Sequence, residues 1–255
     1  MGELRVENLS KNYQRKDGWN TIRTLRVFDN VSFAVREGEF VSIIGPSGCG
    51  KSTLLNLSAG LDPATSGSVF VDGHLVSGPG LDRGVVFQEF ALFPWLTVAG
   101  NIEFGLRSKG VPAAERRTIA QRYVNLVGLT GFEKFHAYRL SGGMRQRVGI
   151  ARALAIEPSV LLMDEPFGAL DAQTRESMQK ALSDIWQAAK KTVLFITHDI
   201  REAVFLSDRV LVMNGRPANI SLEVEIELAR PRNRHDGRFQ EYELQLERAI
   251  ATPVS

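Results

Sequence analysis

One glycine-rich segment has residue types and a spacing suited to holding phosphate. Residues 45–52 read Gly-Pro-Ser-Gly-Cys-Gly-Lys-Ser and match the pattern G-x-x-x-x-G-K-[ST] at every fixed position. Glycines let backbone N–H groups approach an anion, Lys51 supplies a charge for the terminal phosphates, and the Ser52 hydroxyl suits Mg²⁺. The predicted phosphate-binding residues are Gly45, Pro46, Ser47, Gly48, Cys49, Gly50, Lys51, Ser52 and Thr53.

Two adjacent acids, Asp164 and Glu165, follow the apolar run Val160–Met163. The first carboxylate suits Mg²⁺, and the second is predicted to orient or deprotonate a water molecule. Alone, such a pair also marks a strand that simply ends in solvent. Together with the phosphate loop, the pair predicts nucleotide hydrolysis rather than a kinase reaction, because an acid beside the phosphate needs only water as its partner.

A second helix start suited to an oxyanion lies at Leu140-Ser-Gly-Gly-Met144. Ser141 is a good N-cap, and Gly142 and Gly143 leave backbone N–H groups approachable. An ordinary serine-capped helix is the alternative. Because the chain has two such helix ends but a single lysine-bearing loop, we predict that two chains pair, each offering its second end to the other's nucleotide.

Short apolar runs alternate with helical patterns, which predicts a parallel α/β sheet. Residues 1–44 are β-rich, with strands expected at 4–9, 22–28, 31–35 and 40–44 and a hairpin at 68–73. Further buried strands are expected at 85–87, 160–163, 193–196 and 210–213. A helical region follows residue 89, with helices over 97–106, 112–127 (Pro112 in the first turn, Gly128 as C-cap) and 141–156, and a last helix is expected over 238–250.

These elements predict four segments. They are 1–88 (β subdomain and phosphate loop), 89–156 (helical subdomain), 157–230 (second part of the nucleotide-binding core) and 231–255 (a C-terminal helical tail).

The overall composition excludes several classes of protein. The chain has 255 residues and a net charge of +2, whereas nucleic-acid-binding domains usually carry a marked basic excess. No apolar run approaches the roughly 20 residues of a membrane span, and we expect no secretory leader. The single cysteine, Cys49, suits a reducing compartment; we interpret it as a small filler residue, with a reactive thiol as the alternative.

The segment Leu140–Arg147 resembles the signature motif of the ATP-binding cassette (ABC) ATPases. Four further features agree with that family in order and spacing: Tyr13, Gln88, Ala169-Leu170-Asp171 and His198. The resemblance spans about residues 4–215. It implies a P-loop NTPase (RecA-like) α/β core with an N-terminal antiparallel β subdomain and an inserted helical subdomain, and two cassettes that enclose ATP.

The resemblance also implies roles for individual residues. Catalytic roles fall to Glu165, which polarises the attacking water, to His198 at the γ-phosphate, and to Gln88. The expected Mg²⁺ ligands are Ser52, Gln88 and Asp164, and the residues that act on the partner's nucleotide or at the dimer seam are Ser141, Gly142, Gly143 and Asp171. Tyr13 is expected to stack on adenine, with a core tyrosine as its alternative. A hydrogen-bonded histidine at a strand end is the alternative for His198.

The segments Phe93–Val98 and Met163–Arg175 look most like those of importer cassettes for nitrate, sulfonates and taurine. The 40 residues after Gly215 are too few for the regulatory domain usual in sugar and polyamine importers. The resemblance implies transmembrane permease subunits, a solute-binding protein as an indirect partner, no nucleic acid, and a peripheral location on the cytoplasmic face of the inner (plasma) membrane. The alternatives are a soluble ABC ATPase of DNA repair or translation and, less favoured, a non-catalytic nucleotide-binding regulator.

Three residue clusters have open interpretations. Phe90 and Trp95 either meet the membrane subunit or are buried against the helical subdomain. The arginines of the signature region are better explained by a solvated face, partly paired with acids, than by nucleic-acid binding; they are Arg139, Arg145, Arg147 and Arg152. The basic stretch Arg230–Arg238 is interpreted as a solvated loop, with lipid binding or regulation as the alternatives.

Overall fold

A computed structural model describes residues 2–17 and 21–251 of the chain. It forms two compact units, one made of Met1–Pro79 and Thr192–Ser255 and the other of Gly80–Lys191. Within the described ranges, no helix is both long and apolar enough to cross a bilayer.

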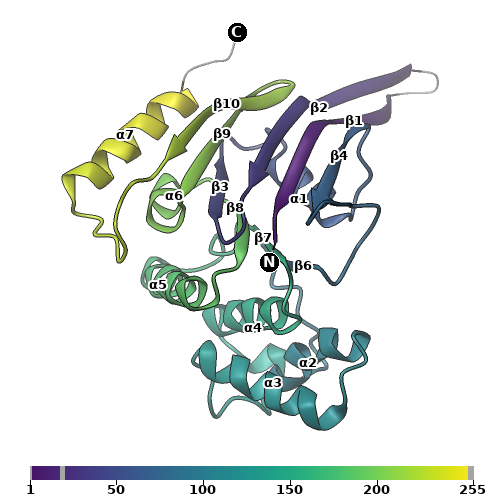
Figure 1. Cartoon of the computed structure of the whole chain (residues 1–255), viewed down its shortest axis with the longest axis vertical. Helices are drawn as coiled ribbons and strands as arrows, with labels where there is room; N and C mark the ends of the chain where they lie inside the picture. The colour runs from purple at the N-terminus through teal and green to yellow at the C-terminus, as the bar shows by residue number, and fades with distance from the viewer. Residues whose placement is uncertain (1, 18–20, 252–255) are drawn as a thin grey trace. The chain divides into compact units, whose positions relative to one another are not determined.

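The first unit is built on a sheet with the strand order β5-β4-β1-β2-β10-β9-β3-β8 (Figure 1). Its strands are β1 (Leu4–Asp17), β2 (Thr21–Val35), β3 (Phe40–Ile44), β4 (Ser66–Val71), β5 (His74–Leu75), β8 (Thr192–Ile196), β9 (Arg209–Gly215) and β10 (Ala218–Glu225), and its helices are α1 (Lys51–Ala59), α6 (Ile200–Leu206) and α7 (Gly237–Ala251). β3 pairs in parallel with both β8 and β9, and all five of its residues are buried, as its unbroken apolar sequence predicts.

The N-terminal strands differ from the prediction. Where three short strands were expected, β1 and β2 form one long antiparallel ribbon. The ribbon continues through polar segments because Asn8 and Asn30 adopt positive φ (48° and 52°) and the register shifts near Val6–Asn12 absorb extra residues. The predicted hairpin is present, with Asp72 and Gly73 both at positive φ between β4 and β5.

The C-terminal helix α7 packs on the first unit, beside α6 and β9 (Figure 1). Phe239 and Leu246 of α7 are buried with Val204 of α6 and Val212 of β9. Asn214 Nδ2 donates a 2.7 Å hydrogen bond to the Ala249 carbonyl, which joins β9 to the end of α7. The helix predicted over 238–250 is therefore confirmed as an integral part of this unit.

The interpretation of 230–238 as a solvated loop is wrong for Arg230 and Arg232. Arg232 is buried, and its guanidinium donates to the carbonyls of Val204 (2.6 Å), Ser207 (2.5 Å), Ile226 (3.1 Å) and Leu228 (3.3 Å). Arg230 donates to the Leu206 carbonyl and, at 2.5 Å, to Asp208. Both arginines satisfy carbonyls at the C-terminal end of α6, where a positive charge is favourable.

The second unit combines a parallel strand pair with helices. Its elements are β6 (Arg83–Val86), α2 (Val98–Ser108), α3 (Ala113–Leu126), η1 (Ala137–Arg139), α4 (Gly142–Ala155), β7 (Val160–Asp164) and α5 (Ala172–Ala189). α2, α3 and α4 pack against one another, as Figure 1 shows. Pro112 proves to be the N-cap of α3 rather than a first-turn residue, and Val127 is its C-cap, with Gly128 following at φ 67°. The four-segment domain division stays a prediction.

Candidate functional site

The phosphate loop connects β3 to α1 in the first unit. Gly50 is the N-cap of α1 and has φ 100°, and a β-carbon there would lie 2.4 Å from Val27 Cγ1. Only glycine meets both constraints. Because Gly50 has no side chain to cap the helix, the first N–H groups of α1 point into the loop without competition from a cap.

Lys51 is drawn into the phosphate loop. Its ammonium donates to the carbonyls of Gly45 (2.9 Å) and Pro46 (3.0 Å), and the side chain is nearly buried, at 5% exposure. Cys49 is also buried, with its sulfur 3.8 Å from Lys51 Nζ, which fits the interpretation as a filler residue. The loop therefore concentrates one positive charge and the helix N-terminus in one place, which suits an anion.

His198 follows β8 at the same edge of the sheet as the phosphate loop. The parallel register pairs Ile43 with Ile196, and Thr197 N–H donates to the Ile43 carbonyl at 3.3 Å. His198 is exposed in the short connection between β8 and α6, just before Asp199, the N-cap of α6. The phosphate loop and His198 thus follow the carboxyl ends of two adjacent parallel strands, the edge at which ligands bind in α/β sheets.

Tyr13 lies on β1 and is not a core residue, because it is 40% exposed. Its hydroxyl donates a 2.6 Å hydrogen bond to Asp62, in the loop that follows α1. A further side-chain hydrogen bond joins Tyr13 to Thr53 in the first turns of α1. An exposed ring tied to the phosphate-loop helix fits the predicted contact with a base.

In the second unit, the β6–β7 register places Gln88 and the two acids at one sheet end. Val86 ends β6 and pairs with Met163, so Gln88, two residues after β6, and Asp164, the last residue of β7, lie at the same end of this parallel pair. Asp164 ends β7, whereas Glu165 leaves the strand with φ 40°, a region that non-glycine residues rarely occupy. Glu165 is therefore turned away from the strand path by its own backbone.

Gln88 and Glu165 border the same space beside Gly168. A β-carbon built on Gly168 would lie 3.8 Å from Gln88 Nε2 and 3.8 Å from Glu165 Oε2. The amide and the carboxylate thus converge from two different loops. This is the arrangement expected of groups that act on one small molecule or ion.

The donor set suits Mg²⁺. By residue type, Ser52 of the first unit and Gln88 and Asp164 of the second offer hydroxyl, amide and carboxylate oxygens, the hard ligands that this ion prefers. Among the described residues, no three His, Cys, Asp or Glu side chains gather into a metal cluster. A single carboxylate with neutral oxygens fits an ion that takes its remaining ligands from water and substrate phosphate.

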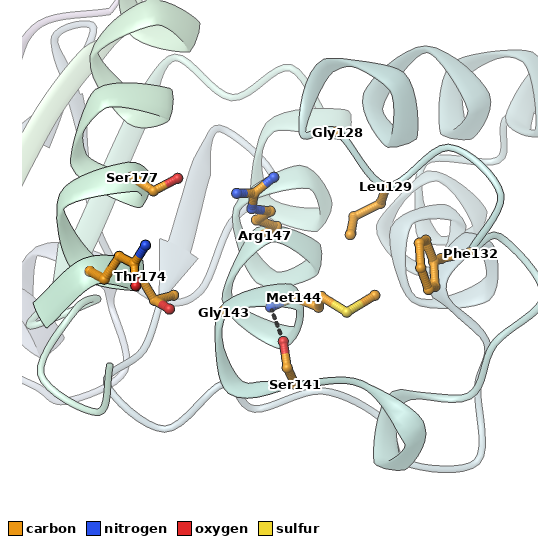
Figure 2. Close-up of a pocket in the computed structure, with 10 residues that line it drawn as sticks. Gly128, Leu129, Phe132, Ser141, Gly143, Met144, Arg147, Thr174 and Ser177 are labelled. Atoms are coloured by element: carbon orange, nitrogen blue, oxygen red, sulfur yellow. Dashed lines mark hydrogen bonds between the residues drawn. The ribbon is translucent and has the colours of Figure 1, made fainter. Parts of the chain in front are cut away.

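The predicted second anion end is the N-terminus of α4. Ser141 is its N-cap, and its Oγ accepts a 3.3 Å hydrogen bond from the Met144 N–H (Figure 2). A cavity of about 420 Å³ opens here, lined on opposite sides by Phe132 and Thr174. Asp171 is the N-cap of α5, accepting from the Thr174 N–H at 3.0 Å; hydrogen bonds from Thr174 lower the pKa of Asp171, so it is ionised at neutral pH.

Of the four arginines of the signature region, Arg139 is exposed, with its guanidinium 6.0 Å from the Phe135 ring centroid. The other three are only partly exposed and do not form a solvated face. Arg145 lies over the Phe90 ring and donates to the Leu140 carbonyl, and Arg147 donates to the Val127 carbonyl. Arg152 lies over Phe93 and donates to the Ala91 carbonyl at 2.6 Å; burial lowers its pKa. These side chains brace loops within the second unit.

Comparison with known proteins agrees with this geometry. A family model described as ABC transporter matches residues 28–168, more than half of the chain. The chain belongs to the ABC transporter family. It is accordingly an ATP-binding cassette with ATPase activity.

Relatives of this ABC cassette include ATP-binding subunits of importers. An uncharacterized ABC transporter ATP-binding protein of Methanocaldococcus jannaschii is 53% identical over 94% of this chain and 88% of its own length. The nitrate import ATP-binding protein NrtD of Synechocystis is 50% identical over 88% of this chain and 83% of its own. The taurine import ATP-binding protein TauB of Burkholderia pseudomallei is 51% identical, with 90% and 86% covered.

A solved structure shares the fold. The dimeric post-hydrolysis state of an ATP-binding cassette bound to ADP and Pi has a TM-score of 0.76 and 34% identity, covering 89% of this ABC cassette and 100% of that chain. The α/β P-loop NTPase fold is thus confirmed.

Sequence reasoning missed three residues that shape the site: Lys11, Asp62 and Thr174. Lys11 and Tyr13 are two apart on one strand and so share a face, a signal that was available. Thr174 stands three residues after its cap Asp171, a spacing typical of a helix start. Asp62 carries no such signal, because only the fold brings it to Tyr13.

Proposed function

We propose that this chain is the ATP-hydrolysing subunit of an ABC importer for a small anion of the nitrate, sulfonate or taurine type. The names of the nitrate and taurine import relatives, about 50% identical over most of the chain, support this substrate class. The observation that carries the hydrolytic role is the convergence of Gln88 and Glu165 beside Gly168. A non-transport ABC ATPase has no observation in its favour.

In this proposal, each group on the chain has a defined task. Lys51 and the backbone N–H groups of residues 45 and 47–53 hold the phosphates, where fixed charge costs no reorganisation during reaction. Glu165 accepts a proton from the attacking water, and His198 donates a hydrogen bond to the γ-phosphate. Ser52, Gln88 and Asp164 would hold Mg²⁺, which supplies charge neutralisation between the phosphates when bound.

We further propose that two cassettes work together. Ser141, Gly142 and Gly143 would contact the nucleotide held mainly by the partner, and Asp171 would lie at the seam between them. The dimeric state of the solved cassette supports this arrangement. The pairing is of two copies or of two related cassettes.

The proposal places the chain at the cytoplasmic face of the inner (plasma) membrane, bound to separate permease subunits and served by a solute-binding protein. An exposed aromatic ladder supports a docking surface: Trp95 packs at 5.6 Å on Phe93, which packs at 4.2 Å on Phe104. Trp95 is 69% exposed, so it suits an interface. Phe90 lies under Arg145, which fits its alternative as an internal packing residue.

The experiment that tests the hydrolytic role is Glu165→Gln. The amide cannot accept the water proton, so the variant should bind ATP like the wild type, lose turnover, and elute as an ATP-dependent dimer. Glu115, an exposed residue of α3, provides the matched control: the Glu115→Gln variant should hydrolyse ATP normally. A Glu165→Gln protein that stays monomeric with wild-type turnover would contradict the assignment.

A further inference from the structure

Two side chains, Lys11 and Asp62, contact Tyr13 and are not used by the phosphate chemistry. Asp62 accepts two hydrogen bonds, one on each carboxylate oxygen: from the Tyr13 hydroxyl (2.6 Å) and from Lys11 Nζ (2.7 Å). Lys11 Nζ also donates to the Pro63 carbonyl at 2.7 Å. Tyr13 is thus fixed at its hydroxyl by a carboxylate that is itself held by a buried lysine.

The same lysine covers one face of the ring. Lys11 Nζ lies 4.6 Å from the Tyr13 ring centroid, within the range of a cation–π contact. The Lys11 side chain is only 7% exposed, so it is not free to swing away. A flat ligand therefore meets Tyr13 on the opposite face alone.

An exposed apolar residue lies across the strand pair from Tyr13. Leu25 of β2 is the direct cross-strand partner of Tyr13 and is 62% exposed. Directly opposite residues on an antiparallel pair project to the same side of the ribbon. Leu25 therefore adds an exposed apolar side chain on the side of the ribbon that carries the Tyr13 ring.

We propose that Lys11 and Asp62 are positioning residues that fix the Tyr13 ring so that a single face is presented to the purine base of the nucleotide. This inference rests on the proposed function, because it takes Tyr13 as the base-stacking residue. The new element is the pair of side chains, Lys11 and Asp62, that fixes the orientation of the ring. It also predicts that Lys11 and Asp62, which lie outside the phosphate loop, contribute to the affinity for the base and not to the affinity for the phosphates.

The ionisation states support the arrangement. Burial opposes ionisation of Asp62, but hydrogen bonds from Lys11 and Tyr13 outweigh it and lower the pKa of the carboxyl. Burial, followed by the hydrogen bond to Asp62, raises the pKa of Tyr13. At neutral pH the carboxylate is charged and the phenol keeps the proton that it donates.

The test compares ATP with inorganic tripolyphosphate, a probe that has phosphates but no base. Asp62→Asn and Lys11→Met should each raise the KM for ATP about fivefold, a partial loss of base stacking, with kcat unchanged. The inhibition constant of tripolyphosphate should stay at its wild-type value. Asp29→Asn, an exposed acid on β2 that accepts from Ser10, is the matched control and should leave both constants unchanged.

Tyr13→Ala separates failure of this inference from failure of the proposed function. The inference predicts that Tyr13→Ala raises the KM for ATP and that adding Asp62→Asn to it raises KM no further. If Tyr13→Ala raises KM while Asp62→Asn and Lys11→Met do not, the positioning role is overturned and the base contact stands. If Tyr13→Ala leaves KM unchanged, both are overturned. Parallel losses of ATP and tripolyphosphate binding in Asp62→Asn would indicate a merely structural role.

Discussion

Gly143, in the first turn of α4, approaches Thr174 of α5 so closely that a β-carbon on Gly143 would lie 2.6 Å from Thr174 Cγ2. Thr174 is not free to turn aside, since its side chain is hydrogen-bonded to Asp171 and a β-branched residue in a helix has few rotamers. The signature helix and the helix after Asp171 are thus packed at a distance that only glycine permits.

Gly143→Ala should therefore destabilise the protein. Overpacking of about 1–3 kcal/mol exceeds the roughly 1 kcal/mol that alanine gains over glycine in a helix, so the melting temperature should fall by several degrees. Gly142→Ala is the matched control, because its β-carbon would meet neighbours only at 3.7 Å and beyond. Adding Thr174→Ser to Gly143→Ala removes the clashing methyl group and should restore the melting temperature. No recovery in the double variant would contradict this packing.

Arg232 should be a major stabilising residue of the first unit. Arg232→Met would leave the buried carbonyls of Val204, Ser207 and Ile226 without this donor, at a cost of roughly 2–4 kcal/mol of unfolding free energy. Burial lowers the pKa of Arg232 to about 10, so it stays charged and its contribution should be constant from pH 6 to pH 8. Denaturant unfolding checks this, with exposed Arg238→Met as the control. Equal unfolding free energies of the Arg232→Met and Arg238→Met variants would show that the hydrogen bonds from Arg232 do not stabilise α6.

Trp95 should be needed for uptake and dispensable for hydrolysis by the isolated cassette. Trp95→Ala removes an exposed ring from the proposed membrane-subunit surface, so it should reduce copurification with the permease and reduce uptake while basal ATPase activity remains. Tyr138→Ala is the matched control, since Tyr138 is an aromatic of the same unit with 67% exposure against 69% for Trp95. If both variants, or neither, lose the permease, the ladder is not the docking surface.

Much of the candidate site could be predicted from local sequence patterns. The phosphate-loop motif consists of eight consecutive residues between an apolar strand and a helix. Its shape is therefore determined by residues that are close in the sequence. His198 could be placed beside it because parallel strands end at the same sheet edge, as the pairing of Ile43 with Ile196 shows. The cap at Ser141 likewise follows from residue type and position.

Contacts between residues far apart in the chain could not be predicted from the sequence. In the sequence, Arg230 and Arg232 look like part of a basic loop. Their hydrogen bonds to the carbonyls of α6 depend on where the fold places that helix. Glu165 was expected at the strand end, but its positive φ depends on the turn that follows. Asp62 and Tyr13 are brought together by the folding of β1 beside the loop after α1, and no spacing rule connects them.

In the proposed function, ATP hydrolysis by this chain drives uptake of a small anion. The most direct measurement is uptake of labelled nitrate, taurine and an aliphatic sulfonate by cells that lack the gene for this chain, complemented with the wild type or with Glu165→Gln. We expect the deletion to abolish uptake of one of these solutes, and we expect the wild-type chain, but not Glu165→Gln, to restore it. Unchanged uptake of all three solutes, or full restoration by Glu165→Gln, would contradict it.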